Sequence, residues 1–189
     1  GASAVAIGCG MGTGQRQRGI LEEVLYLAKC PVIIDADGIN NLAMDISIVS
    51  DAKCPVVLTP HFGEMAKICR TTVQEIQKAP LLCAQELAAQ LKATIVLKGA
   101  HTIVASPDGR TFLNQTGNPG LAKAGSGDIL TGILSSLISQ GMSAFDAAVC
   151  AVYLHGAAAD RCVERMSEYF MQPDDILIDL GRLLKEHIR

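Results

Sequence analysis

The sequence predicts an α/β protein with a mainly parallel central sheet and helices on both of its faces. Short apolar runs alternate with helical segments up to residue 98, which is typical of successive strand–helix–strand units. Apolar residues make up 49% of the chain and aromatic residues only 4%. The core is therefore expected to consist of Ala, Val, Ile and Leu, as in sheets buried on both faces.

Four apolar runs are expected to form the parallel strands, at residues 4–8, 32–35, 56–59 and 94–98. Each of the first three is followed by a glycine or proline turn that separates it from a helix. The periodicity predicts these helices at about 15–29, 40–43, 63–70 and 80–92.

Two of the predicted helices carry more specific signals. In the helix at 15–29, the spacing places Ile20, Val24, Leu27 and Ala28 on one apolar face. Thr72 and Glu75 have the spacing of a capping box, so a further helix is expected to begin there.

The second half of the chain departs from this alternation. Residues 102–105 and 111–113 flank Ser106-Pro-Asp-Gly-Arg110, which predicts a hairpin and therefore antiparallel strands. A glycine-rich segment then leads into a helix at 128–140. We expect a second helix, capped by Ser143 and reaching about residue 163, and a last one near residue 173. No repeat or linker divides the 189 residues, so we expect a single domain, 1–189.

Charge and cysteine content exclude several function classes. The formal charge is −3 and no run of basic residues exists, which argues against nucleic acid as the main partner. No apolar stretch approaches the roughly 20 residues that a membrane helix needs. The seven cysteines form no Cys-x-x-Cys pair, so we expect no metal-ligating set but reduced core thiols in a cytoplasmic protein.

The unusual polar motifs all fall at one predicted edge of the sheet. They lie in the loops after residues 8, 35, 59 and 98 and in the glycine turn at 125–127. Ligands of parallel sheets bind beyond the carboxyl ends of the strands. We therefore expect an active site at this edge.

The segment Ala124-Gly-Ser-Gly-Asp128 carries the strongest chemical signal. Small residues let the backbone approach a phosphate, and the following helix offers free N–H groups and a partial positive charge. Asp128 would sit beside this anion and could take a proton from a substrate hydroxyl. The alternative is that Asp128 only offsets the helix dipole and that the glycines only allow close packing.

The other motifs each permit a functional and a structural interpretation. Lys98 could neutralise a phosphate or be a surface lysine at a strand end. His61 could orient a substrate and Glu64 could act through magnesium-bound water, or the two could belong to a capped helix. The carboxylates of Asp35 and Asp37 could bind substrate hydroxyls or a hydrated metal ion, whereas Asp37 could equally cap a helix.

Five segments, taken in order, resemble the NAD(P)H-hydrate dehydratase family, a branch of the ribokinase-like superfamily with a three-layer α/β/α fold. They cover most of the chain between residue 5 and about residue 160. The segments are Ile7–Gly12, Asp35–Asn40, Leu58–Glu64, Val96–Thr102 and Asn114–Asp128.

The resemblance implies an enzyme that repairs hydrated NADH or NADPH. Such an enzyme uses ADP or ATP, with magnesium, to phosphorylate the added ring hydroxyl, after which phosphate leaves. It also implies a homo-oligomer, often a homotetramer in this family, and Asp128 as the base. Motifs and resemblance together give nucleotide-binding candidates Lys98, Gly99, Ala100, His101, Thr102, Gly125, Ser126 and Gly127, and substrate-binding candidates Gly10, Gly12, Asp35, His61, Glu64, Asn118 and Asp128.

The sequence also departs from the family pattern. Phe62 stands where the family usually has Pro, Gly38-Ile39 where it has Ala-Leu, and Lys123-Ala124 where it has Thr-Gly. Family domains carry about a third more chain before the first strand, so we expect this domain to be incomplete at its N-terminus. Two alternatives stay open: a sugar or hydroxyethylthiazole kinase of the same superfamily, and an inert nucleotide-binding module.

Overall fold

The computed structural model describes residues 1–187 and contains a six-stranded sheet in the order β1-β2-β3-β4-β5-β6. The first four strands are parallel, and β4, β5 and β6 pair in antiparallel fashion. The predicted parallel strands and hairpin are therefore confirmed. The strands are β1 (Val5–Ile7), β2 (Val32–Ile34), β3 (Val56–Leu58), β4 (Thr94–Leu97), β5 (Ile103–Ala105) and β6 (Thr111–Leu113).

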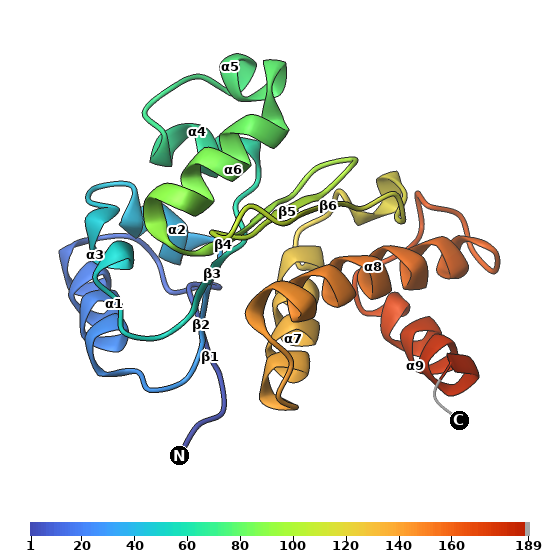
Figure 1. The fold of residues 1–189 in the computed structure, drawn as a ribbon. Helices are drawn as coiled ribbons and strands as arrows, with labels where there is room; N and C mark the ends of the chain where they lie inside the picture. Colours follow the sequence, from blue (N-terminus) through green and yellow to red (C-terminus); the bar gives the residue numbers. More distant parts are fainter. Residues whose placement is uncertain (188–189) are drawn as a thin grey trace.

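One layer of helices covers the first face of this sheet (Figure 1). Alternate strand residues such as Val32, Ile34 and Leu58 point into this layer and are buried. Its helices are α1 (Gln15–Leu27), α2 (Asp37–Leu42), α3 (Ser47–Ser50), α4 (Phe62–Ile68), α5 (Val73–Lys78) and α6 (Pro80–Leu91). The helix expected at Thr72 is confirmed, because the Thr72 side chain accepts a hydrogen bond from the Glu75 N–H at the start of α5.

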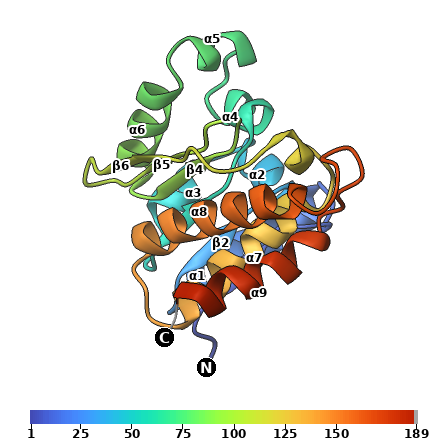
Figure 2. The same ribbon diagram turned by 90° about the vertical axis from the view of Figure 1, so that its right-hand side faces the viewer.

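A second layer of helices lies on the opposite face (Figure 2). The intervening strand residues Ile33, Val57 and Val96 pack there against α7 (Ser126–Ser139) and α8 (Ala144–Val163). Ser143 caps α8, as predicted. The last helix, α9 (Asp175–His187), packs on α8, and a short 3-10 helix, Pro119–Leu121, precedes α7. The predicted three-layer α/β/α arrangement is thus confirmed.

Three details of the sequence prediction are wrong. In α1 the buried residues are Leu21 and Leu25, whereas Ile20 and Leu27 are exposed, because the helix is rotated from the predicted face. Helix α2 begins at Asp37, three residues before its predicted start. All seven cysteines are free, but only Cys162 is buried; the others lie on loops and outer helix positions.

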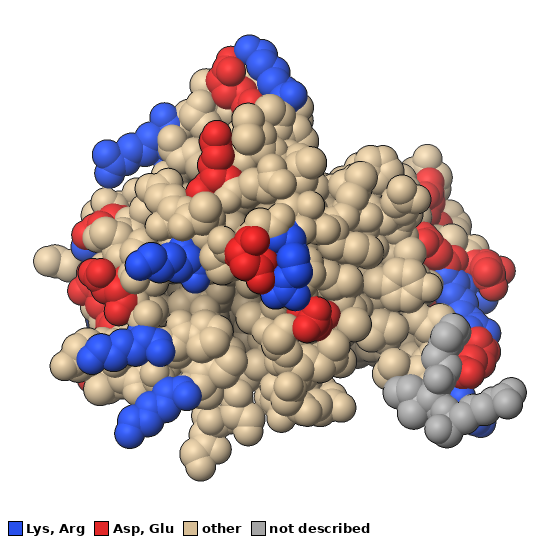
Figure 3. All heavy atoms as spheres, viewed as in Figure 1, with Lys and Arg blue, Asp and Glu red and all other residues tan. Residues whose placement is uncertain are grey.

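The surface offers no concentration of basic charge on the face shown in Figure 3, where Lys and Arg side chains are dispersed among acidic and uncharged residues. Within residues 1–187, no helix is both long and apolar enough to cross a membrane.

Candidate active site

A cavity of about 780 Å³ lies where the loops after the parallel strands meet the start of α7. It is bounded by the loops after β2, β3 and β4, the segment between β6 and α7, and one face of α8. Twelve of the candidate residues line it: Asp35, His61, Glu64, Lys98, Gly99, Ala100, Thr102, Asn118, Gly125, Ser126, Gly127 and Asp128.

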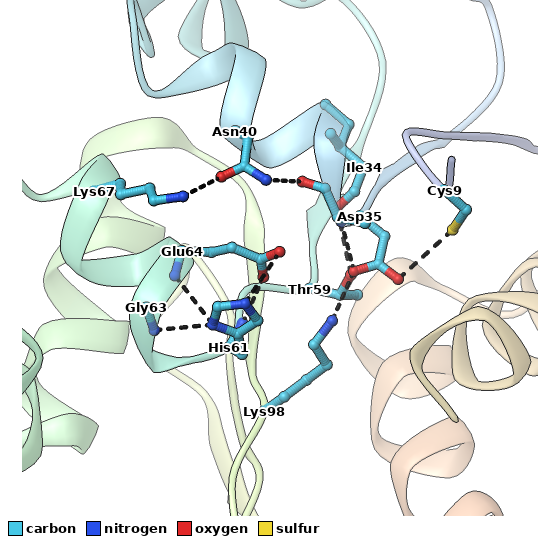
Figure 4. A network of polar contacts seen from close by, with 11 residues as sticks. Cys9, Ile34, Asp35, Asn40, Thr59, His61, Gly63, Glu64, Lys67 and Lys98 are labelled. Carbon is cyan, nitrogen blue, oxygen red and sulfur yellow. Dashed lines mark hydrogen bonds and ion pairs between the residues drawn. The ribbon is translucent and has the colours of Figure 1, made fainter. Parts of the chain in front are cut away.

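Lys98 and Asp35 line this cavity and form an ion pair (Figure 4). Nζ of Lys98 lies 2.7 Å from Oδ1 of Asp35, and Thr131 of α7 donates to Oδ2 over 2.8 Å. Burial alone would raise the pKa of Asp35. The Lys98 charge and the hydrogen bonds from Lys98, Thr59 and Thr131 outweigh burial and hold this pKa below its ordinary value. Asp35 is therefore a buried, ionised carboxylate.

His61 and Glu64 form a capping box at the start of α4 (Figure 4). Nδ1 of His61 accepts hydrogen bonds from the N–H groups of Gly63 and Glu64, and Oε2 of Glu64 accepts from the His61 N–H. Because Nδ1 is an acceptor, the proton of the neutral imidazole resides on Nε2. The capping interpretation is therefore confirmed, while contact with a substrate stays a prediction for both residues.

The first turn of α7 supplies an anion site beside the ion pair. Gly125 adopts a left-handed conformation, with φ of 95°, that turns the chain into the helix. A side chain on Gly127 would lie 3.5 Å from both Asp35 Oδ2 and Lys98 Nζ. The free N–H groups of the helix thus open next to an ammonium group, an arrangement that suits a phosphate.

Asp128 also lies in the first turn of α7, and its side chain contacts Cys9, which belongs to the loop after β1. Ligating atoms of Cys9, Asp35 and Asp128 all lie within 4.8 Å of one another. Burial, the hydrogen bond to Asp128 and the charge of Asp35 raise the pKa of the Cys9 thiol to about 12. The thiol therefore stays protonated and donates to carboxylates.

Three candidates, Gly10, Gly12 and His101, do not line the cavity. The Gly12 N–H donates to Oδ2 of Asp37 over 2.9 Å, so Asp37 holds the loop after β1. The alternative in which Asp37 caps α2 is wrong, since the N-cap residue is Ala36 and no side chain caps that end. The Asp37 carboxylate therefore binds the loop after β1 and not the N–H groups at the start of its own helix.

Sequence reasoning missed the contribution of α8, because no candidate site residue was assigned to that helix. Asp160 of α8 accepts hydrogen bonds from the Gly117 N–H and from Nδ2 of Asn118, at 2.8 and 3.1 Å. A side chain on Gly156 would lie 2.3 Å from Oγ1 of Thr116. The one available signal was polar residues, a histidine and a glycine within an otherwise Ala-rich helix.

Lys123, at which the sequence departs from the family pattern, makes specific contacts in the structure. Its Nζ donates to the carbonyl oxygens of Glu168, Tyr169 and Met171. An ammonium group has three N–H donors, so all of them are used. Lys123 therefore fastens the segment between α8 and α9 to the loop that precedes α7.

Comparison with known proteins agrees with this geometry. The family model described as NAD(P)H-hydrate dehydratase matches residues 1–181. The chain belongs to this family. It is 44% identical over 162 residues to the ADP-dependent (S)-NAD(P)H-hydrate dehydratase of Neisseria meningitidis, covering 84% of this chain and 54% of that protein. It is 41% identical over 181 residues to a bifunctional NAD(P)H-hydrate repair enzyme of Moorella thermoacetica, covering 96% and 34%.

The chain is also similar to a solved structure, that of the ADP/ATP-dependent NAD(P)H-hydrate dehydratase of Bacillus subtilis, co-crystallised with ATP and Mg²⁺. The TM-score is 0.87 at 36% identity, over 97% of this chain and 64% of that one. The chain thus spans between about a third and two thirds of the length of these relatives.

Proposed function

We propose that this protein catalyses the nucleotide-dependent dehydration of hydrated NADH or NADPH. The observation that carries the proposal is the meeting of three elements in one cavity: the start of α7, the carboxylate of Asp128 and the ammonium of Lys98. Family membership and the names of the similar proteins support the same reaction.

In the first step, Asp128 takes the proton of the hydroxyl that hydration added to the nicotinamide ring. The hydroxyl oxygen forms a bond to the terminal phosphorus of ADP or ATP. The bond to the leaving AMP or ADP breaks, and that group keeps the electron pair. The N–H groups of α7 and the charge of Lys98 stabilise the transferring phosphoryl group.

In the second step, the bond between the ring carbon and the phosphate oxygen breaks. Phosphate leaves with the electron pair, and the neighbouring ring carbon gives up a proton to water, which restores the double bond. The same N–H groups that held the phosphoryl group also stabilise departing phosphate. The products are the repaired cofactor, phosphate and AMP or ADP.

The cavity wall also fits a magnesium–nucleotide complex. Magnesium prefers oxygen ligands and is commonly held by one or two carboxylates together with phosphate groups and water. Glu64 lines this cavity, and its carboxylate would hold the ion there through magnesium-bound water. When bound, the ion neutralises phosphate charge during transfer.

The assay that tests this function follows absorbance in the reduced-nicotinamide band. The protein, magnesium and hydrated NADH or NADPH are mixed, and ADP or ATP is added last. We expect recovery of the band only after nucleotide is added, and the comparison shows which nucleotide and which cofactor are preferred. Nucleotide binding without recovery would contradict the proposal and favour a related kinase or an inert module. Light scattering would test the expected homotetramer.

A further inference from the structure

Two buried polar atoms have no hydrogen-bond partner among residues 1–187: Oγ of Ser126 and Nε2 of His155. The two residues are only 5% and 8% exposed, and both line the cavity. Leaving a buried polar atom unpaired costs about 1–3 kcal/mol. Native proteins retain few such atoms, so two at one site require an explanation.

The two residues are coupled to each other. The His155 imidazole interacts through a hydrogen bond with the Ser126 backbone, and this bond acts to raise the His155 pKa. A bond with that effect is one in which the imidazole N–H donates to a carbonyl oxygen. His155 of α8 thus holds the first residue of α7, where the anion site begins.

His155 is also uncharged at neutral pH. Burial lowers its pKa to about 4, the Lys98 charge acts in the same direction, and the Ser126 hydrogen bond only partly opposes them. A neutral imidazole has one donor and one acceptor nitrogen. The side chain can therefore orient a neighbouring peptide group without adding a second positive charge beside Lys98.

The place of His155 on α8 is fixed by its neighbour. Gly156 approaches Thr116 so closely that a side chain there would lie 2.6 Å from the Thr116 carbonyl oxygen. Oγ1 of Thr116 in turn donates to the carbonyl oxygen of Tyr153 over 3.0 Å. These contacts lock this part of α8 against the cavity wall.

We propose that His155 is a positioning residue for nucleotide phosphate, acting through Ser126. The imidazole orients the Ser126 peptide so that the free N–H groups of α7 face the cavity. Rotation about the single side-chain bond of Ser126 brings its hydroxyl to a phosphoryl oxygen, which supplies the partner that Oγ lacks. This assignment rests on the proposed function, because it presumes that the cavity takes ADP or ATP.

Titration calorimetry with ADP and magnesium tests the assignment. His155→Leu retains the size of the side chain but loses the donor, and we expect about tenfold weaker ADP binding, the effect of one well-placed hydrogen bond. His155→Gln restores an N–H donor and should recover most of the affinity. Val149→Ala removes packing from the same helix outside the cavity and should bind ADP like the wild type.

Ser126→Ala provides a second test with opposite effects on two measurements. The thermal midpoint without nucleotide should stay level or rise, because an unpaired buried hydroxyl is removed. ADP affinity should fall, because the phosphoryl oxygen loses its donor. A merely structural role for Ser126 would move both measurements in the same direction.

The outcomes separate this assignment from the function on which it rests. Wild-type affinity in His155→Leu, or an equal loss in Val149→Ala, would overturn the role of His155 while leaving the nucleotide site intact. Unchanged affinity in Ser126→Ala would overturn the coupling. A wild-type protein that bound no ADP would contradict the nucleotide site itself, and the role of His155 with it.

Discussion

Nζ of Lys98 lies 2.7 Å from Oδ1 of Asp35, although the two residues are 63 positions apart and follow strands separated by β3. The hydroxyl of Thr59, just after that middle strand, donates to the carbonyl oxygen of Ile34 beside Asp35 and helps to lower the pKa of the Asp35 carboxyl. The residues that follow three neighbouring strands therefore lie around one buried carboxylate, that of Asp35. The ion pair links the stability of the sheet edge to the electrostatics of the cavity.

Removal of Lys98 should destabilise the protein. Asp35 is 1% exposed, so Lys98→Met leaves a buried charge without its partner, and we expect a loss of about 3–5 kcal/mol in unfolding free energy. Urea unfolding at pH 7 measures it. In the double variant Asp35→Asn/Lys98→Met the loss should be much smaller than the sum of the single losses, and simple additivity would show that the two side chains do not interact.

Asp35 should also make stability depend on pH. Its pKa in the folded protein is lowered from the ordinary 3.8, so its contribution is present above about pH 4 and is lost as pH falls through the folded-state value. The difference in unfolding free energy between wild type and Asp35→Asn should shrink between pH 6 and pH 3. A difference that grew on acidification would mean that the folded protein raises this pKa.

Asp128→Asn should separate binding from catalysis. The amide preserves the shape of the side chain but cannot accept the substrate proton, so turnover should fall by a factor of about 10²–10⁴. Nucleotide affinity, measured by calorimetry, should change little. Turnover close to that of the wild type would remove Asp128 from the mechanism.

Two helical glycines should respond oppositely to substitution by alanine. In Gly156→Ala the new methyl group would lie 2.3 Å from Thr116, and we expect a loss of about 1–3 kcal/mol. An added methyl group on Gly132 of α7 meets no atom within 4 Å beyond the adjoining turns of its own helix, so Gly132→Ala should gain about 0.5–1 kcal/mol. Thermal unfolding of both variants gives the comparison, and equal effects would contradict the close approach of α8 to Thr116.

Cys9 should be unreactive despite its exposure. A thiol with a pKa of about 12 is ionised in only about one molecule in 10⁴ at pH 8. Mass spectrometry after brief iodoacetamide treatment should show slow labelling of Cys9. Asp128→Asn removes a carboxylate that holds the thiol proton, and we expect labelling about tenfold faster. Rapid labelling of the wild type would mean that the carboxylates do not hold this proton.

Much of the scaffold followed from local patterns. Short apolar runs and their turn residues predicted the strands β1 to β6, because each run buries in a sheet through its own side chains. The same patterns placed the polar motifs at one edge of the sheet, where the structure has its cavity, and twelve of the candidate residues line that cavity. The prediction of the buried face of α1 was wrong, because the rotation of this helix about its axis is set by packing against other elements.

The sequence by itself determined the fold class, the family resemblance and the edge of the sheet where polar motifs gather. Only the tertiary structure decided which side chains meet: that Lys98 is paired with Asp35, that Asp37 holds Gly12, and that α8 contributes His155. The reason is physical. Strand and helix patterns are set by neighbouring residues, whereas these contacts join residues far apart in the chain, and their pairing depends on how whole layers pack together.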